Sequence, residues 1–134
     1  MSTIIDQNFK QWLSTRPGGE RLLGCFLCGT CTAGCPISEI EKDYDPRKIM
    51  RQILLGMKSE VLNSGELWKC YQCHTCVAHC PQDVRFADVV RALREMAIEE
   101  GVWDIEFAKK IEELDLQARK DRLEKVSALL EDNS

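Results

Sequence analysis

Apolar residues recur every three or four positions along this chain, as they do in amphipathic helices, and no segment shows the strict alternation of a β-strand. The first such stretch ends at the helix breaker Pro17-Gly18-Gly19. We therefore predict an all-α fold that begins with a short amphipathic helix. The apolar residues of this first helix are Ile5, Phe9, Trp12 and Leu13.

Two more helices are predicted in the middle of the chain. Asp45 can cap the longer one, and Pro46 suits its first position because the proline nitrogen has no hydrogen to leave unpaired there. Gly56 is expected to end this helix. A shorter helix is predicted over residues 58–63. The apolar stripe of the longer helix consists of Ile49, Ile53 and Leu54.

A further helix is predicted between Asp83, which can serve as its cap, and Gly101, which ends it. Its apolar side is continuous, which indicates a helix packed on the protein core. The predicted buried residues are Phe86, Val89, Val90, Leu93, Met96 and Ala97.

The last predicted helix runs from Trp103 to about Leu130, with charged residues between its apolar positions. Its apolar stripe is longer than a small core can easily cover, so the helix either docks on another subunit or folds back on the core. We predict three segments: an N-terminal helix or arm over residues 1–20, a core over 21–101 and a docking helix over 102–134. The stripe consists of Phe107, Ile111, Leu114, Ala118, Leu123, Val126 and Leu130.

Composition limits the class of protein. The chain has 134 residues, a net charge of -4 and no cluster of Lys and Arg that could follow a phosphate backbone, so nucleic acid is not an expected partner. It has no secretion signal at its start and no apolar run near the ~20 residues of a membrane span, so we expect a cytoplasmic protein without membrane insertion. Because cytoplasmic thiols stay reduced, the eight cysteines indicate metal binding rather than disulfides.

All eight cysteines lie in an internal repeat. The segment from Cys25 to Pro36 returns 45 positions later as the segment from Cys70 to Pro81, and a predicted helix follows each copy. The repeated unit is thus a cysteine loop plus a helix, and two such units can face each other across a pseudo-twofold axis.

The spacing of the cysteines is typical of [4Fe-4S] clusters. In each copy three cysteines are separated by two residues, and a fourth follows after three more residues, directly before a proline. In two-cluster ferredoxins with this arrangement the fourth cysteine ligates the other cluster. The prediction is therefore one cluster on Cys25, Cys28, Cys31 and Cys80, and a second on Cys70, Cys73, Cys76 and Cys35.

Two other uses of this motif fit the spacing less well. Structural zinc needs four ligands at each site, so the third cysteine of each copy and the cysteine-proline pairs would have no purpose there. His74 and His79 lie in the second motif, but the cysteines already fill all eight ligand positions, and we expect exposed rings or donors to cluster sulfur. Phe26 and Tyr71 occupy equivalent positions and are expected to shield the clusters. The cations that flank the motifs are Arg47, Lys48, Lys69 and Arg85.

The doubled motif and its helical surroundings resemble the C subunit of heterodisulfide reductase over roughly residues 20–100. The resemblance implies an alpha-helical ferredoxin domain, similar also to the cluster-bearing half of the iron-sulfur subunit of succinate dehydrogenase. It further implies a hetero-oligomer in which this chain relays single electrons between the A subunit, with its flavin and iron-sulfur clusters, and the B subunit, where the disulfide chemistry occurs. The matching phrases are DPRKIMRQILLGM, ELWKCYQCHTC and CPQDVRFADVVRALREMAIE.

Alternatives to this function stay open. A freestanding dicluster ferredoxin needs only the cluster core, so the added terminal helices favour a complex. A zinc-stabilised interaction module would be colourless, whereas cubane clusters are brown. The sequence has no nucleophile with a base and no nucleotide-binding fingerprint, so we do not expect the chain alone to be an enzyme.

Overall fold

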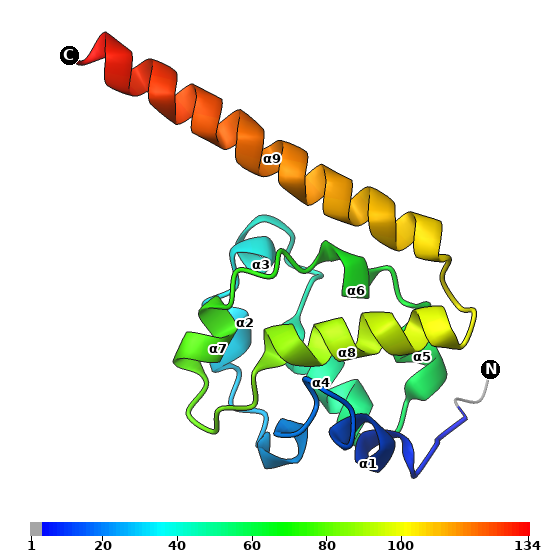
Figure 1. Ribbon diagram of the computed structural model, residues 1–134. Helices are drawn as coiled ribbons and strands as arrows, with labels where there is room; N and C mark the ends of the chain where they lie inside the picture. The colour runs from blue at the N-terminus through cyan, green and yellow to red at the C-terminus, as the bar shows by residue number, and fades with distance from the viewer. Residues whose placement is uncertain (1–3) are drawn as a thin grey trace. The chain divides into compact units, whose positions relative to one another are not determined.

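The computed structural model describes residues 4–134, and within this range it contains only helices and the loops that join them (Figure 1). The predicted all-α fold is confirmed. The chain divides into two compact units, the first ending at Val102 and the second comprising Trp103–Ser134. Residues 1–3 of the predicted N-terminal segment lie outside the described residues.

The core of the first unit is built around α8, Phe86–Glu99. All six residues predicted for its buried side have at most 4% of their surface exposed. Helices α1 (Phe9–Ser14), α4 (Pro46–Leu54) and α5 (Lys58–Asn63) complete the core, and α5 lies against α8. Each large apolar side chain buried here contributes about 1.5–3 kcal/mol to folding.

The boundaries of α4 follow from local chemistry, as predicted. The Asp45 carboxylate accepts a hydrogen bond from the backbone N–H of Lys48 at 3.2 Å, which satisfies a free donor at the helix start. After the helix, Gly56 adopts a φ of +78°, and an added Cβ would lie 2.5 Å from the carbonyl oxygen of Asp6. Only glycine fits this turn without strain.

Three details of the helix prediction were wrong. Asp83 does not cap α8: the N-cap is Arg85 in a left-handed conformation, without a side-chain cap, and the Asp83 carboxylate instead accepts from Arg85 Nε. In α4, Met50 is buried although it was not part of the predicted stripe, whereas Leu54 of the predicted stripe is only half-buried. Ile5 is half exposed and precedes α1 rather than belonging to it.

Short helices lie within and beside the two cysteine motifs. The helices α2 (Thr30–Ala33) and α7 (Thr75–His79) come from equivalent places in the two copies and lie side by side (Figure 1). The two motifs therefore meet in space although 45 residues separate them in the chain. The remaining short helices are the 3-10 helix Leu22–Gly24, α3 (Pro36–Ile40) and α6 (Glu66–Lys69).

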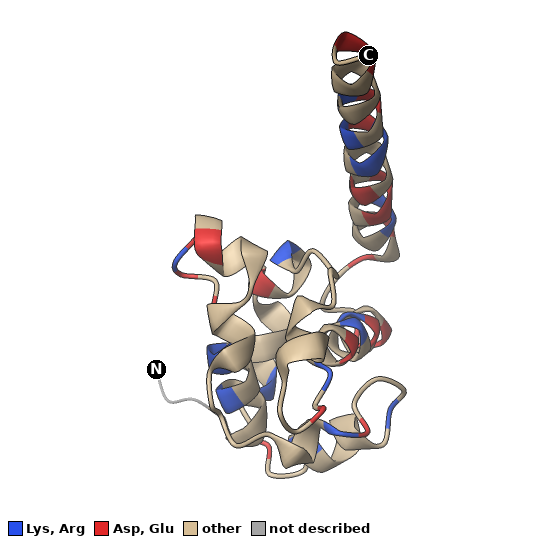
Figure 2. Cartoon of the chain, turned by 90° about the vertical axis from the view of Figure 1, so that its left-hand side faces the viewer, with Lys and Arg blue, Asp and Glu red and all other residues tan. Residues whose placement is uncertain are grey.

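The second unit is a single long helix, α9, Ile105–Asp132. Asp104 caps it by accepting from the backbone N–H of Glu106 at 3.2 Å, and the rings of Trp103 and Phe107 lie 4.9 Å apart. None of its residues is buried, and charges of both signs are spread along its length (Figure 2). Among the described residues, no helix combines the length and the apolar character needed to cross a membrane.

Candidate metal centre

The two cysteine loops share one backbone conformation. Leu27 and its counterpart Gln72 have φ values of 59° and 57°, and Gly29 and its counterpart His74 have values of 84° and 62°. Left-handed conformations are uncommon outside glycine, so finding them at matching positions means that the loop geometry repeats along with the sequence. This repeated geometry matches the two pseudo-symmetric units predicted from the cysteine spacing.

The first cavity collects cysteines from both copies of the motif. Cys25, Cys28 and Cys31 line it from the first copy, and Cys76 and Cys80 line it from the second. Burial raises the pKa of the Cys25 thiol, and the backbone N–H of Leu27, which donates to the Cys25 sulfur at 3.4 Å, opposes this effect. The lining of the cavity brings Cys80 together with Cys25 although 55 positions separate them in the chain.

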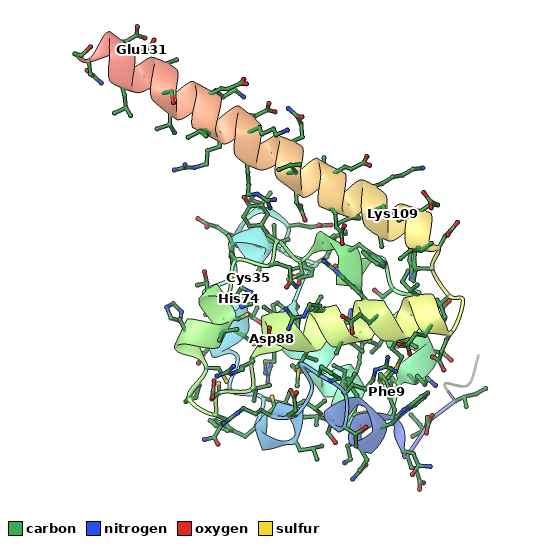
Figure 3. All side chains as sticks on the ribbon, in the orientation of Figure 1. Phe9, Cys35, His74, Asp88, Lys109 and Glu131 are labelled. Carbon is green, nitrogen blue, oxygen red and sulfur yellow. The ribbon has the colours of Figure 1, made fainter. Side chains whose placement is uncertain are left out.

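The second cavity is arranged in the reciprocal way. Cys70, Cys73 and Cys76 of the second copy line it together with Cys35 of the first. His74 lines the same cavity, and Figure 3 labels it beside Cys35. Each fourth cysteine therefore lies with the three cysteines of the other copy, while its assignment as a cluster ligand stays a prediction.

The lining of the two cavities suits cubane clusters. Both are lined mainly by cysteine and apolar side chains, and no carboxylate is found among the lining residues. Within residues 4–134, no three His, Cys, Asp or Glu side chains gather closely enough to hold a single metal ion. A cubane spreads four thiolates over four irons, so its ligands stand further apart than those of one ion.

The two cavities are adjacent. Cys76 and Phe86 line both of them, so one side chain from α7 and one from the first turn of α8 form a shared wall. Both residues are largely buried, with 9% and 4% of their surface exposed. Two clusters bound here would be separated by protein side chains rather than by solvent.

The thiols differ in how readily they lose a proton. Cys28 is exposed, and its hydrogen bond with the Thr30 hydroxyl, 3.2 Å away, is the main cause of a lowered pKa. Burial instead raises the pKa of Cys31, and that of Cys76 to about 11. Because iron binds thiolates, the buried thiols must release protons when a cluster is bound.

Cys73 and Thr75 repeat the pair formed by Cys28 and Thr30. The sulfur of Cys73 and the hydroxyl of Thr75 are 3.3 Å apart and form a hydrogen bond. When the sulfur is a thiolate, the hydroxyl must be the donor. The identical threonines in the two copies are a signal in the sequence that could have identified these partners in advance.

Two arginines hold the backbone of the cysteine loops. Arg47 lines the first cavity, and its Nε donates to the carbonyl oxygen of Leu27 at 2.7 Å. Arg94 in α8 donates to the carbonyl oxygens of Leu67 and Cys70 at 2.8 and 2.9 Å. Sequence reasoning missed Arg94, although its helical spacing from buried neighbours marks it as an arginine on the core side of α8.

The aromatic and histidine predictions are only partly met. Phe26 and Tyr71 line the first and second cavities at equivalent positions, but 59% and 50% of their surface is exposed, so they shield only one side. His74 and His79 are both exposed, as predicted, and His79 lies against Gly34.

The flanking cations also differ from one another. Lys69 binds Glu41 and Glu66 at 2.8 and 2.9 Å, and Arg85 binds Asp83. Of the four flanking cations, Arg47 lines one of the two cysteine-lined cavities.

Known protein families give an independent identification of this region. Residues 24–85 match the family described as 4Fe-4S dicluster domain. The C2 subunit of the H(2)/formate:CoB-CoM heterodisulfide,ferredoxin reductase of Methanococcus maripaludis is 44% identical over 80 residues, which are 60% of this chain and 42% of the relative. The iron-sulfur C subunit of the CoB-CoM heterodisulfide reductase of Methanopyrus kandleri is 46% identical over 77 residues, which are 58% of this chain and 40% of the relative.

A third relative covers more of the chain. The C subunit of the H(2):CoB-CoM heterodisulfide,ferredoxin reductase of Methanothermobacter marburgensis is 38% identical over 97 residues, 72% of this chain and 51% of the relative. The chain spans about half the length, or somewhat less, of these curated relatives. It therefore belongs with the proteins that resemble the C subunit of heterodisulfide reductase, and its α-helical 4Fe-4S dicluster domain carries two [4Fe-4S] clusters.

Proposed function

We propose that this chain is the electron-transfer iron-sulfur subunit of a heterodisulfide reductase-type complex. The observation that carries the proposal is the pair of adjacent thiol-lined cavities that share Cys76 and Phe86. When bound, each [4Fe-4S] cluster takes up and releases one electron. Two such sites close together allow an electron to pass from one to the other within the protein.

The protein's part is to hold and insulate the two sites. The proposed ligands exchange their fourth member between the loops, which ties the two halves of the domain together. Buried Phe86 excludes water between the cavities, whereas the exposed cysteines of each loop, Cys28 and Cys73, face solvent. In this arrangement each site has one side open toward a redox partner and one side facing the other site. The proposed sets are Cys25, Cys28, Cys31 with Cys80, and Cys70, Cys73, Cys76 with Cys35.

The partners and the location belong to the same proposal. Relatives named as C subunits of heterodisulfide reductases support assembly into a complex of several subunits, in which we expect the flavin-containing A subunit and the B subunit as neighbours. The apolar stripe of α9, with no buried residue, is the surface we propose for docking on a partner. Eight unpaired thiols support a reducing compartment such as the cytoplasm.

The ligand exchange can be tested with matched variants of equivalent cysteines. In protein purified without oxygen, Cys28→Ala and Cys73→Ala first identify the electron paramagnetic resonance signals of the two clusters. Cys35→Ala should then lose the signal that Cys73→Ala loses, and about half of the iron. Cys80→Ala should lose the signal that Cys28→Ala loses.

The contrary results are equally distinct. If Cys35→Ala lost the signal that Cys28→Ala loses, each loop would bind its own cluster and the exchange would be wrong. A colourless wild-type protein containing zinc and no iron would refute the electron-transfer function altogether.

A further inference from the structure

Tyr44 is a buried phenol at the edge of the second cavity. Only 1% of its surface is exposed, and its hydroxyl makes no hydrogen bond of standard geometry within residues 4–134. An unpaired polar group in a protein interior costs about 1–3 kcal/mol, so such a hydroxyl normally has a partner. We therefore expect a hydrogen-bond acceptor beside the Tyr44 hydroxyl.

The surroundings of the ring indicate what that acceptor is. Tyr44 lines the second cavity together with Cys35 and Cys70. The side chain of Cys70 is within hydrogen-bonding reach of the Tyr44 hydroxyl. A phenol has an ordinary pKa of about 10 and keeps its proton at neutral pH, so the hydroxyl is a hydrogen-bond donor with cluster-binding sulfur as the nearby acceptor.

Hydrogen bonds to Tyr44 and to the next residue fix the backbone that carries the Tyr44 ring. The Ser38 hydroxyl, itself 8% exposed, donates to the Tyr44 carbonyl oxygen at 2.7 Å. The next residue, Asp45, caps α4 and also accepts from the Thr32 hydroxyl at 2.6 Å. A ring anchored in this way can hold its hydroxyl at one place in the cavity wall.

We infer that the Tyr44 hydroxyl donates a hydrogen bond to the sulfur of the cluster in the second cavity and thereby favours the reduced state of that cluster. This inference rests on the proposed cluster sites. Reduction adds negative charge to the cluster, and a hydrogen bond to its sulfur stabilises that charge. The first cavity has no tyrosine among its lining residues, so Tyr44 acts on one cluster of the pair.

The test is the Tyr44→Phe variant, which removes only the hydroxyl. In a potentiometric titration followed by electron paramagnetic resonance, the reduced-to-oxidised ratio of the second cluster at fixed potential should fall about tenfold, or ~59 mV for one electron. The first cluster should keep its midpoint. Tyr71→Phe, the same change on a half-exposed ring beside the same cavity, should shift either midpoint far less.

A second readout reports the hydrogen bond itself. Electron-nuclear double resonance of the second cluster should show a proton signal in H2O that disappears after exchange into D2O. Tyr44→Phe should lack this signal. The amide of Gln72, which donates to the Cys70 sulfur at 3.4 Å, supplies another exchangeable proton that should remain in the variant. The difference between the two spectra therefore isolates the phenol.

A further variant covers the case in which Tyr44→Phe does not fold. The chain has two tyrosines, so Tyr71→Phe protein grown with fluorotyrosine carries the label at Tyr44 alone. The more acidic phenol is a stronger donor and should raise the midpoint of the second cluster, opposite to Tyr44→Phe. Unchanged midpoints with both clusters intact, or equal shifts in both clusters, would overturn the inference. Wild-type protein without iron would instead overturn the proposed function.

Discussion

Arg94 is expected to hold the backbone on which the second cluster site depends. Its guanidinium donates to the Leu67 and Cys70 carbonyl oxygens and lies 5.1 Å from the centre of the Trp68 ring. The side chain thus connects α8 to the end of α6, where Cys70 begins the second motif. Arg94→Ala would remove both hydrogen bonds and loosen this end of the cysteine loop.

The magnitude follows from the two hydrogen bonds. Bonds that involve a charged group contribute about 1.5–3 kcal/mol each, and water entering a half-buried site recovers part of this. A net loss of about 1.5–3 kcal/mol in the local stability of the loop is expected. Since 1.4 kcal/mol corresponds to a factor of ten, local opening should become at least about tenfold more frequent.

The assay is the rate at which a chelator removes iron without oxygen, followed by visible absorbance and by the resonance signal of each cluster. Arg94→Ala should accelerate loss of the second cluster about tenfold or more. Arg91→Ala is the matched control, because Arg91 lies on the same helix with 56% of its side chain exposed and pairs with Asp88 at the surface. Such a pair contributes about 0–1 kcal/mol. Equal rates for the two variants would refute the argument.

Two more predictions concern pH and the C-terminal helix. Because burial raises the pKa of thiols such as Cys76, the free chain holds protons at neutral pH that cluster binding must release, so iron retained per chain in reconstitution should rise between about pH 6.5 and 8.5. Retention that is independent of pH would contradict this. Deleting residues 103–134 should leave the iron content and thermal unfolding of the remainder nearly unchanged, because α9 has no buried residue, and should weaken assembly with partners. Loss of iron, or full co-purification with partners, would argue against this assignment.

Local signals were sufficient for much of the fold. Asp45 and Gly56 bound α4 as predicted, because a cap and a left-handed turn depend on residues only a few positions apart. The continuous apolar side of α8 likewise identified its buried residues. The same reasoning failed at Asp83, where ion pairs with Arg21 and Arg85 hold the carboxylate away from the helix end.

By itself, the sequence determined the kind of chemistry. A doubled motif with all eight cysteines at repeated intervals predicts two [4Fe-4S] clusters and an all-helical fold, because cysteine spacing and helical periodicity are properties of short segments. The family of the domain followed from the same segments and is borne out by its relatives.

Only the tertiary structure decided what surrounds each cavity. Cys35 lies with the cysteines of the other copy, Tyr44 turns a phenol toward that cavity, and Arg94 reaches carbonyl oxygens 24 and 27 positions away. These contacts join residues far apart in the chain. They arise from how the helices pack, which local spacing does not encode.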